Sequence, residues 1–185
     1  MYCIALCVLL VFALVDISSS EPQTETIQAQ AFGTTTMSGR TFGITIIIED
    51  YSTPADQKAL IDALTQGGHD KVVDVISHMK SKGRIRLSSG GVGYQINYIR
   101  NIPTKTGRTI RLITDRPIYF GEAYYNGRSR DYDLSLIEIH LNHNKKESTG
   151  SLVFGGRFRV NKKKQQIEFE TYEASPWRLA GIMER

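Results

Sequence analysis

RFRVNKKKQQIEFE, residues 157–170, has the pattern of two antiparallel strands joined by a charged turn. One register places apolar residues opposite apolar residues on one face and arginines opposite glutamates on the other. The opposed pairs are Val160 with Ile167, Phe158 with Phe169, Arg159 with Glu168 and Arg157 with Glu170. Because side chains alternate between the faces of a strand, a shift of one residue would break both sets of pairs. The stretch therefore predicts an antiparallel hairpin whose three lysines lie in an exposed loop.

Alternation with a period of two runs through most of the chain. From Arg84 onward, turn residues separate strand-like segments that read GRIRLS, GYQINYIR, GRTIRLITD, DYDLSLIEIHLN, TGSLVFGGRFRV, QQIEFETY and SPWRLAGIM. Earlier in the chain, TFGITIIIED (residues 41–50) is dense in β-branched residues, which favour strands. Ile27, Ala29 and Ala31 alternate with polar residues and indicate a weaker first strand. A disordered linker is the alternative interpretation of that first segment.

Residues 53–82 carry the helical pattern. Thr53 and Pro54 suit the N-cap and the first position of a helix, and Asp56 has the spacing of a capping box. Two apolar runs of helical period follow, separated by the glycine pair at 67–68. We therefore predict an α+β fold: a mostly antiparallel β barrel or sandwich of about 8–9 strands with one inserted helical hairpin.

The N-terminal segment, residues 1–20, predicts a signal peptide. Residues 4–15 form an unbroken apolar run, shorter than the roughly 20 residues that span a bilayer but typical of a secretory h-region. Ser18 and Ser20 fit a cleavage site between small residues. An uncleaved membrane anchor is the alternative. We expect a secreted or periplasmic protein with no membrane span after cleavage, in which residues 21–185 form a single β-rich domain.

This prediction also decides the cysteine chemistry. Cys3 and Cys7, the two cysteines of the chain, lie inside the predicted signal. Disulfides, cysteine nucleophiles and thiolate metal sites are therefore not expected in the exported domain. The formal charge of the chain is +4, and loss of Asp16 with the signal makes it +5. For an exported protein, so modest a basic excess favours an envelope or extracellular partner over nucleic acid.

The remaining motifs predict no cofactor and no metal site. SSGGVGYQ (residues 88–95) resembles a phosphate-binding loop, but a strand follows it where such a loop needs a helix, so the glycines indicate a hairpin turn. His140 and His143 have the spacing of half a zinc site, yet no neighbouring acid obviously completes it. No nucleophile elbow and no helical zinc motif occurs. An enzyme is not the favoured interpretation.

TDRPIYFGEAYYNGRSRDYD, residues 114–133, differs from its surroundings in its density of tyrosine and arginine, residues that favour binding surfaces. The candidate contact residues are Arg116, Tyr119, Glu122, Tyr124, Tyr125, Arg128, Arg130 and Asp131. The structural interpretation, which we favour, has charges at the two ends pairing across a strand connection while Ile118 and Phe120 enter the core. Residues 122–129 then form an exposed loop, where contacts are expected.

Several segments together resemble a family of small exported bacterial proteins. These are STPADQKALIDAL with the glycine pair after it, GYQINYIR, GRTIRLITDRPIYF, SRDYDLSLIEIHLN and IEFETYEASPWRL. The resemblance covers about residues 44–179. It implies a secreted or periplasmic bacterial protein with one shared fold, and the family has no assigned activity, ligand or partner. It also marks the TDRP and RDY stretches as family features.

Three functions are open at this point. The first is an exported, non-catalytic β-rich domain that binds or scaffolds an envelope or extracellular partner. The second is a carrier of a small apolar ligand, in a barrel capped by the helical hairpin. The third is a hydrolase that uses acids near Asp115 and Asp131, with Glu122 and Asp133 as further candidates.

The structural interpretation of the RDY stretch predicts a stability effect. We expect Asp131→Ala to lower the melting temperature by about 6 °C or more, because removing one partner of a buried ion pair costs about 3–5 kcal/mol. An unchanged melting temperature would assign this carboxylate to contacts outside the fold.

Overall fold

The computed structural model describes residues 24–88, 93–115, 118, 134–154, 157–161, 166–170 and 176–185. The strands are β1 (Glu25–Phe32), β2 (Thr41–Ile48), β3 (Gly83–Leu87), β4 (Tyr94–Thr104), β5 (Gly107–Thr114), β6 (Leu136–Asn142), β7 (Thr149–Val153), β8 (Arg157–Asn161), β9 (Gln166–Glu170) and β10 (Trp177–Glu184). One α-helix, α1 (Pro54–His78), follows β2, and two 3₁₀ turns are η1 (Thr35–Met37) and η3 (Lys145–Glu147).

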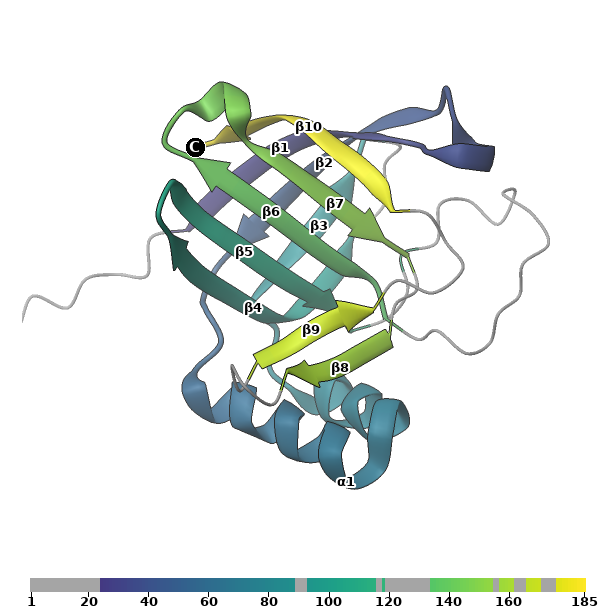
Figure 1. Cartoon of the computed structure of the whole chain (residues 1–185), viewed down its shortest axis with the longest axis vertical. Helices are drawn as coiled ribbons and strands as arrows, with labels where there is room; N and C mark the ends of the chain where they lie inside the picture. Colours follow the sequence, from purple (N-terminus) through teal and green to yellow (C-terminus); the bar gives the residue numbers. More distant parts are fainter. Residues whose placement is uncertain are drawn as a thin grey trace, which may run out of the picture.

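Eight strands close into an antiparallel barrel in the order β1-β10-β7-β6-β5-β4-β3-β2 (Figure 1). The predicted antiparallel α+β fold is thus confirmed, as a barrel rather than a sandwich. β8 and β9 form a separate two-stranded sheet with the predicted register, Val160 opposite Ile167 and Arg157 opposite Glu170. The prediction of one strand over TGSLVFGGRFRV is wrong, because β7 and β8 are distinct strands that belong to different sheets.

The barrel interior is packed with aliphatic side chains. Ile46, Ile85, Ile99, Ile110 and Ile139, from five different strands, are all fully buried there. The weak first strand is confirmed, since its three alternating apolar residues lie in the same core. Burying one such side chain contributes about 1.5–3 kcal/mol, so the interior is the main source of stability.

The helix begins with the predicted capping box. The N–H of Asp56 donates to Thr53 Oγ1 at 3.1 Å, and the N–H of Thr53 donates to Asp56 Oδ2 at 2.7 Å. The predicted hairpin of two helices is not confirmed: one helical element runs to His78, and it is kinked at Gly68, whose φ of 68° lies in the region that glycine enters readily. The chain changes direction at this single non-helical residue. Two antiparallel helices are usually joined by a loop of about 2–5 residues.

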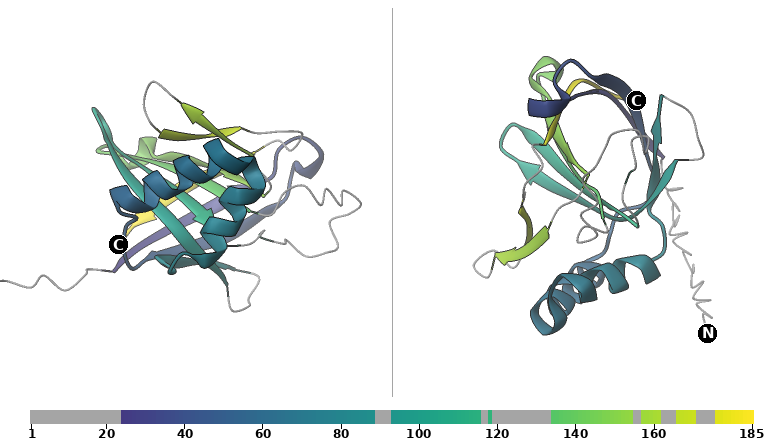
Figure 2. Two further views of the ribbon diagram at one scale, coloured as in Figure 1. Left: turned by 90° about the horizontal axis from the view of Figure 1, so that it is seen from below. Right: turned by 90° about the vertical axis from the view of Figure 1, so that its right-hand side faces the viewer.

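The helix packs on the outside of the barrel wall, near the sheet of β8 and β9 (Figures 1 and 2). Its buried Leu60, Val72 and Ile76 belong to a second apolar cluster, together with outward residues of β4 to β7 such as Ile113. A bulge in β4 turns Asn97 toward the helix, where its Nδ2 donates to the carbonyl of Ile76 at 2.9 Å. Within the described ranges, no helix is both long and apolar enough to cross a membrane.

Two adjacent residues of β2 test which side chains face the barrel interior and which face outward. Ile46 is fully buried, whereas Ile47 faces outward and is partly exposed. Ile46→Ala should lower the free energy of unfolding by about 2–5 kcal/mol, because it leaves a cavity. Ile47→Ala should cost about 1 kcal/mol or less, the span of strand propensity. Urea unfolding of both variants measures the difference, and equal losses would contradict this assignment of faces.

Candidate functional site

All eight residues of the predicted contact surface, from Arg116 to Asp131, lie outside the described part of the chain, so that prediction stays a prediction. Two residues beside them are described. Ile118 is buried in the barrel core, as expected, and its N–H donates to Ser135 Oγ at 2.8 Å. The backbone N–H of Asp115, just after β5, donates to the carbonyl of Gln95 at 3.2 Å. The other candidate acids of the hydrolase hypothesis fall outside the described residues.

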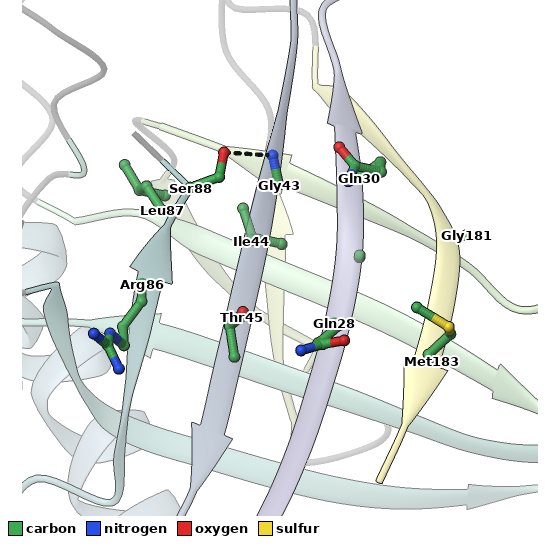
Figure 3. Close-up of a pocket in the computed structure, with 11 residues that line it drawn as sticks. Gln28, Gln30, Gly43, Ile44, Thr45, Arg86, Leu87, Ser88, Gly181 and Met183 are labelled. Atoms are coloured by element: carbon green, nitrogen blue, oxygen red, sulfur yellow. Dashed lines mark hydrogen bonds between the residues drawn. The ribbon is translucent and has the colours of Figure 1, made fainter. Parts of the chain in front are cut away.

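The described residues do form a hollow elsewhere, on the outer face of β3, β2, β1 and β10 (Figure 3). Its volume is about 370 Å³, and we call it the outer groove. The lining residues are Gln28, Ala29, Gln30, Gly43, Ile44, Thr45, Arg86, Leu87, Ser88, Gly181 and Met183. Sequence reasoning did not identify this site.

One row of side chains crosses the outer groove from strand to strand. Gln28 lies opposite Met183 on one side and opposite Thr45 on the other, and Thr45 lies opposite Arg86. Figure 3 shows these four side chains in sequence across the four strands. A long amide, a hydroxyl, a guanidinium and a thioether are therefore neighbours on one surface.

The groove is hollow because the next row has glycines. Gly43 lies opposite Gln30, and its N–H donates to Ser88 Oγ at 2.9 Å. A Cβ at Gly43 would come within 3.3 Å of the Ser88 Cβ, so a larger residue would crowd this position. On β10 the register shifts by one residue between Gln30 and Gln28, and Gly181 occupies this bulge with a φ of 61°. The bulge and the two missing side chains lower the floor of the groove.

The outer groove lies on a face with a positive charge balance. Arg86 is exposed and has no ionic partner among the described residues. On the same face, the guanidinium of Arg178 lies 5.4 Å from the centre of the Phe32 ring. The outward positions of these four strands contain no Asp or Glu within their described bounds. By contrast, Arg111 on β5 pairs with Glu138 on β6.

A second polar cluster spans one end of the barrel. β1 and β5 are four positions apart in the ring of eight strands, yet Arg108 of β5 reaches Glu25 of β1. Its two terminal nitrogens donate to Glu25 at 2.5 and 3.2 Å, and one also donates to Glu184 at 2.8 Å. Tyr51 donates to Glu25 at 2.6 Å and accepts from Arg108 at 3.2 Å. We call Glu25, Tyr51, Arg108 and Glu184 the clasp.

The clasp perturbs the titration of its members. Burial, together with the hydrogen bond to Glu25, raises the pKa of Tyr51 to about 12. Burial alone would lower the pKa of Arg108, but the hydrogen bond and negative charge of Glu25 outweigh it, so the net shift is upward. Every charged member has an opposite charge beside it. The charged groups of the clasp therefore satisfy one another across the barrel end, and removing one of them would leave another partly buried charge without compensation.

His140 belongs to a further polar cluster, which does not line the outer groove. Its Nδ1 lies 3.0 Å from Thr109 Oγ1 and its Nε2 lies 3.2 Å from Glu138 Oε1, an order of hydroxyl, imidazole and carboxylate found in nucleophilic enzymes. Glu138, however, is already paired with Arg111, and none of these residues lines the outer groove. Among the described residues, no group of three or more His, Cys, Asp or Glu is placed to hold a metal ion.

These features define a class of protein: a closed antiparallel β-barrel with a helix on its wall and a polar groove on its outer face. Comparison of the chain with protein-family models, with curated proteins and with solved structures finds no match. Function is therefore inferred from the contacts and charges of the described residues.

The perturbed tyrosines predict how stability depends on pH. Because the pKa of Tyr51 is raised in the folded state, its contribution is complete below the ordinary pKa of about 10 and is lost as the pH rises toward about 12. Burial raises the pKa of Tyr98 to about 12 as well. The free energy of unfolding should fall over this range, and Tyr51→Phe and Tyr98→Phe should each make the fall shallower. Urea unfolding at stepped alkaline pH tests this, and an unchanged slope in Tyr51→Phe would refute the role of the clasp.

Proposed function

We propose that this protein is an exported, non-catalytic β-barrel domain that binds an envelope or extracellular partner through the outer groove. The observation that carries the proposal is Arg86: an exposed cation with no ionic partner among the described residues, placed at the edge of a groove of about 370 Å³. Cations elsewhere on the barrel, such as Arg108 and Arg111, have carboxylates beside them.

The groups that line the groove suit binding better than catalysis. Gln28 and Gln30 provide amides, and Thr45 and Ser88 provide hydroxyls, so the groove offers both hydrogen-bond donors and acceptors. None of its lining residues is a His, Asp or Glu, the groups that most often transfer protons in enzymes. A ligand can therefore be held by hydrogen bonds and by one charge, without a group poised to react with it.

Two observations bear on where this binding occurs. The N-terminal segment predicts export, which places the partner in the envelope or outside the cell. The Tyr- and Arg-rich segment from Arg116 to Asp131 remains a candidate for a second contact surface. For the alternative of a ligand carrier, α1 packs against outward residues of the barrel wall and also contacts β8 and β9, so its described contacts lend no support to a helix that caps the mouth of the barrel.

The proposal predicts that reversing the charge of Arg86 weakens binding to envelope material. The protein recovered after export should cosediment with an insoluble envelope fraction of the organism that encodes it. Arg86→Glu should reduce the bound fraction at least about tenfold, the equivalent of about 1.4 kcal/mol, because it removes a charge-assisted hydrogen bond and adds repulsion.

The matched control is Lys105→Glu, which makes the same change of net charge in the exposed turn between β4 and β5. It should bind as the wild type does. Both variants should melt within about 2 °C of the wild type, because both positions are exposed. Equal binding by wild type and Arg86→Glu would refute the groove as the binding site.

A further inference from the structure

We propose that the ligand of the outer groove is an acidic polysaccharide, a hydroxyl-rich chain that bears carboxylate groups. This inference rests on the proposed function, because it names the partner of the same groove. It is drawn from the charge of the face, the chemistry of the lining and the spacing of its arginines.

The positive charge of this face favours an anionic ligand. Arg86 has no ionic partner among the described residues, and its guanidinium presents the forked donors that match a carboxylate. Arg84, two residues earlier on β3, also faces outward, and its carboxylate partner among the described residues is Glu49, 3.6 Å away and about half exposed. Over the described bounds of the four strands, no outward Asp or Glu would repel an anionic ligand.

The amide and hydroxyl side chains that line the outer groove favour a ligand rich in hydroxyl groups. An amide side chain both donates and accepts hydrogen bonds, and so does a hydroxyl. Gln28, Gln30 and Thr45 therefore provide neighbouring partners for several hydroxyl groups of a sugar, in either hydrogen-bonding sense. Met183 adds an exposed thioether beside Gln28, which can contact the apolar face of a sugar ring.

The distance between the arginines favours a polymeric ligand over a small anion. Arg86 lies on β3 in the row of Gln28, whereas Arg178 lies on β10 in the row of Phe32, four residues further along β1. With strands about 4.8 Å apart and about 3.3 Å per residue, the two Cα atoms are roughly 20 Å apart over the sheet. A single carboxylate cannot reach both guanidinium groups, but a polymer with repeated carboxylates can.

Protein and membrane partners fit this face less well. Interfaces between proteins are anchored by tryptophan, tyrosine and arginine side chains in well-packed pockets, and membrane-bound surfaces insert apolar side chains. Met183, 53% exposed, is the sole strongly exposed large hydrophobic residue of the described chain. The ring of Phe32 on this face is already covered by Arg178.

The test is a titration of the exported protein with defined probes. Polygalacturonate and digalacturonate are the acidic probes, dextran is the neutral polymer, and vesicles containing phosphatidylglycerol are the anionic membrane. We expect polygalacturonate to bind, with an affinity that falls as salt is raised, because exposed charges are screened. Binding of dextran as tightly as polygalacturonate, or binding of the vesicles alone, would overturn the proposal.

Substitutions of the arginines test whether the ligand binds in the outer groove. Arg86→Gln should weaken polygalacturonate binding about tenfold or more, and Arg86→Lys, which keeps the charge but loses the fork, should weaken it less. Arg178→Gln should weaken the binding of polygalacturonate but not of digalacturonate, because the short probe cannot span the two arginines. Lys105→Gln is the control and should bind like wild type. Unchanged affinity in both Arg86 variants would overturn the proposal.

This experiment separates failure of the ligand class from failure of the proposed function. If the protein cosediments with the envelope through Arg86 but binds no polygalacturonate, the acidic polysaccharide is wrong and the binding role stands. If cosedimentation does not depend on Arg86, the groove is not the binding site, and both the proposed function and the proposed ligand are refuted.

Discussion

Pairing of β1 with both β2 and β10 is the constraint on which the rest of the molecule depends, because it joins the first and last strands of the barrel. Closure satisfies backbone groups that an open sheet would leave at its edges. It also brings Ile27 and the inward residues of β2 into one aliphatic core. The outer groove arises at this same junction, since its floor is lowered where β10 bulges against β1 at Gly181.

The two polar regions of the barrel follow from the inward or outward direction of each side chain. Glu25 follows the inward alternation of β1, and from there it meets Arg108 across the end of the barrel. Gln28 and Gln30 point outward from the same strand and line the groove. The inward set is fully paired and contributes stability, whereas the outward set keeps a cation without an ionic partner among the described residues. We propose the second set as the binding site because unpaired polar groups are the ones that a ligand can satisfy.

Local patterns predicted local structure well. The register of Val160 with Ile167 followed from complementary pairs on two faces, and the capping box of Thr53 followed from spacing alone. The helical hairpin is not confirmed: the glycine pair was interpreted as a stop between two helices, and the structure has one helical element with a non-helical kink at Gly68. Whether a glycine ends a helix or bends it depends on what the following turn packs against, here the outer wall of β4 to β7.

The outer groove was not predicted, although two signals for it were present. Gly43 and Gly181 stand inside predicted strands, where glycine often marks a bulge or a hollow. The sequence by itself determined the alternation of apolar residues, the antiparallel hairpin and the start of the helix, because these depend on residues close together in the chain. Only the tertiary structure decided that Arg86, Gln28 and Met183 lie in one row across the wall, because barrel closure brings together strands that lie far apart in the sequence.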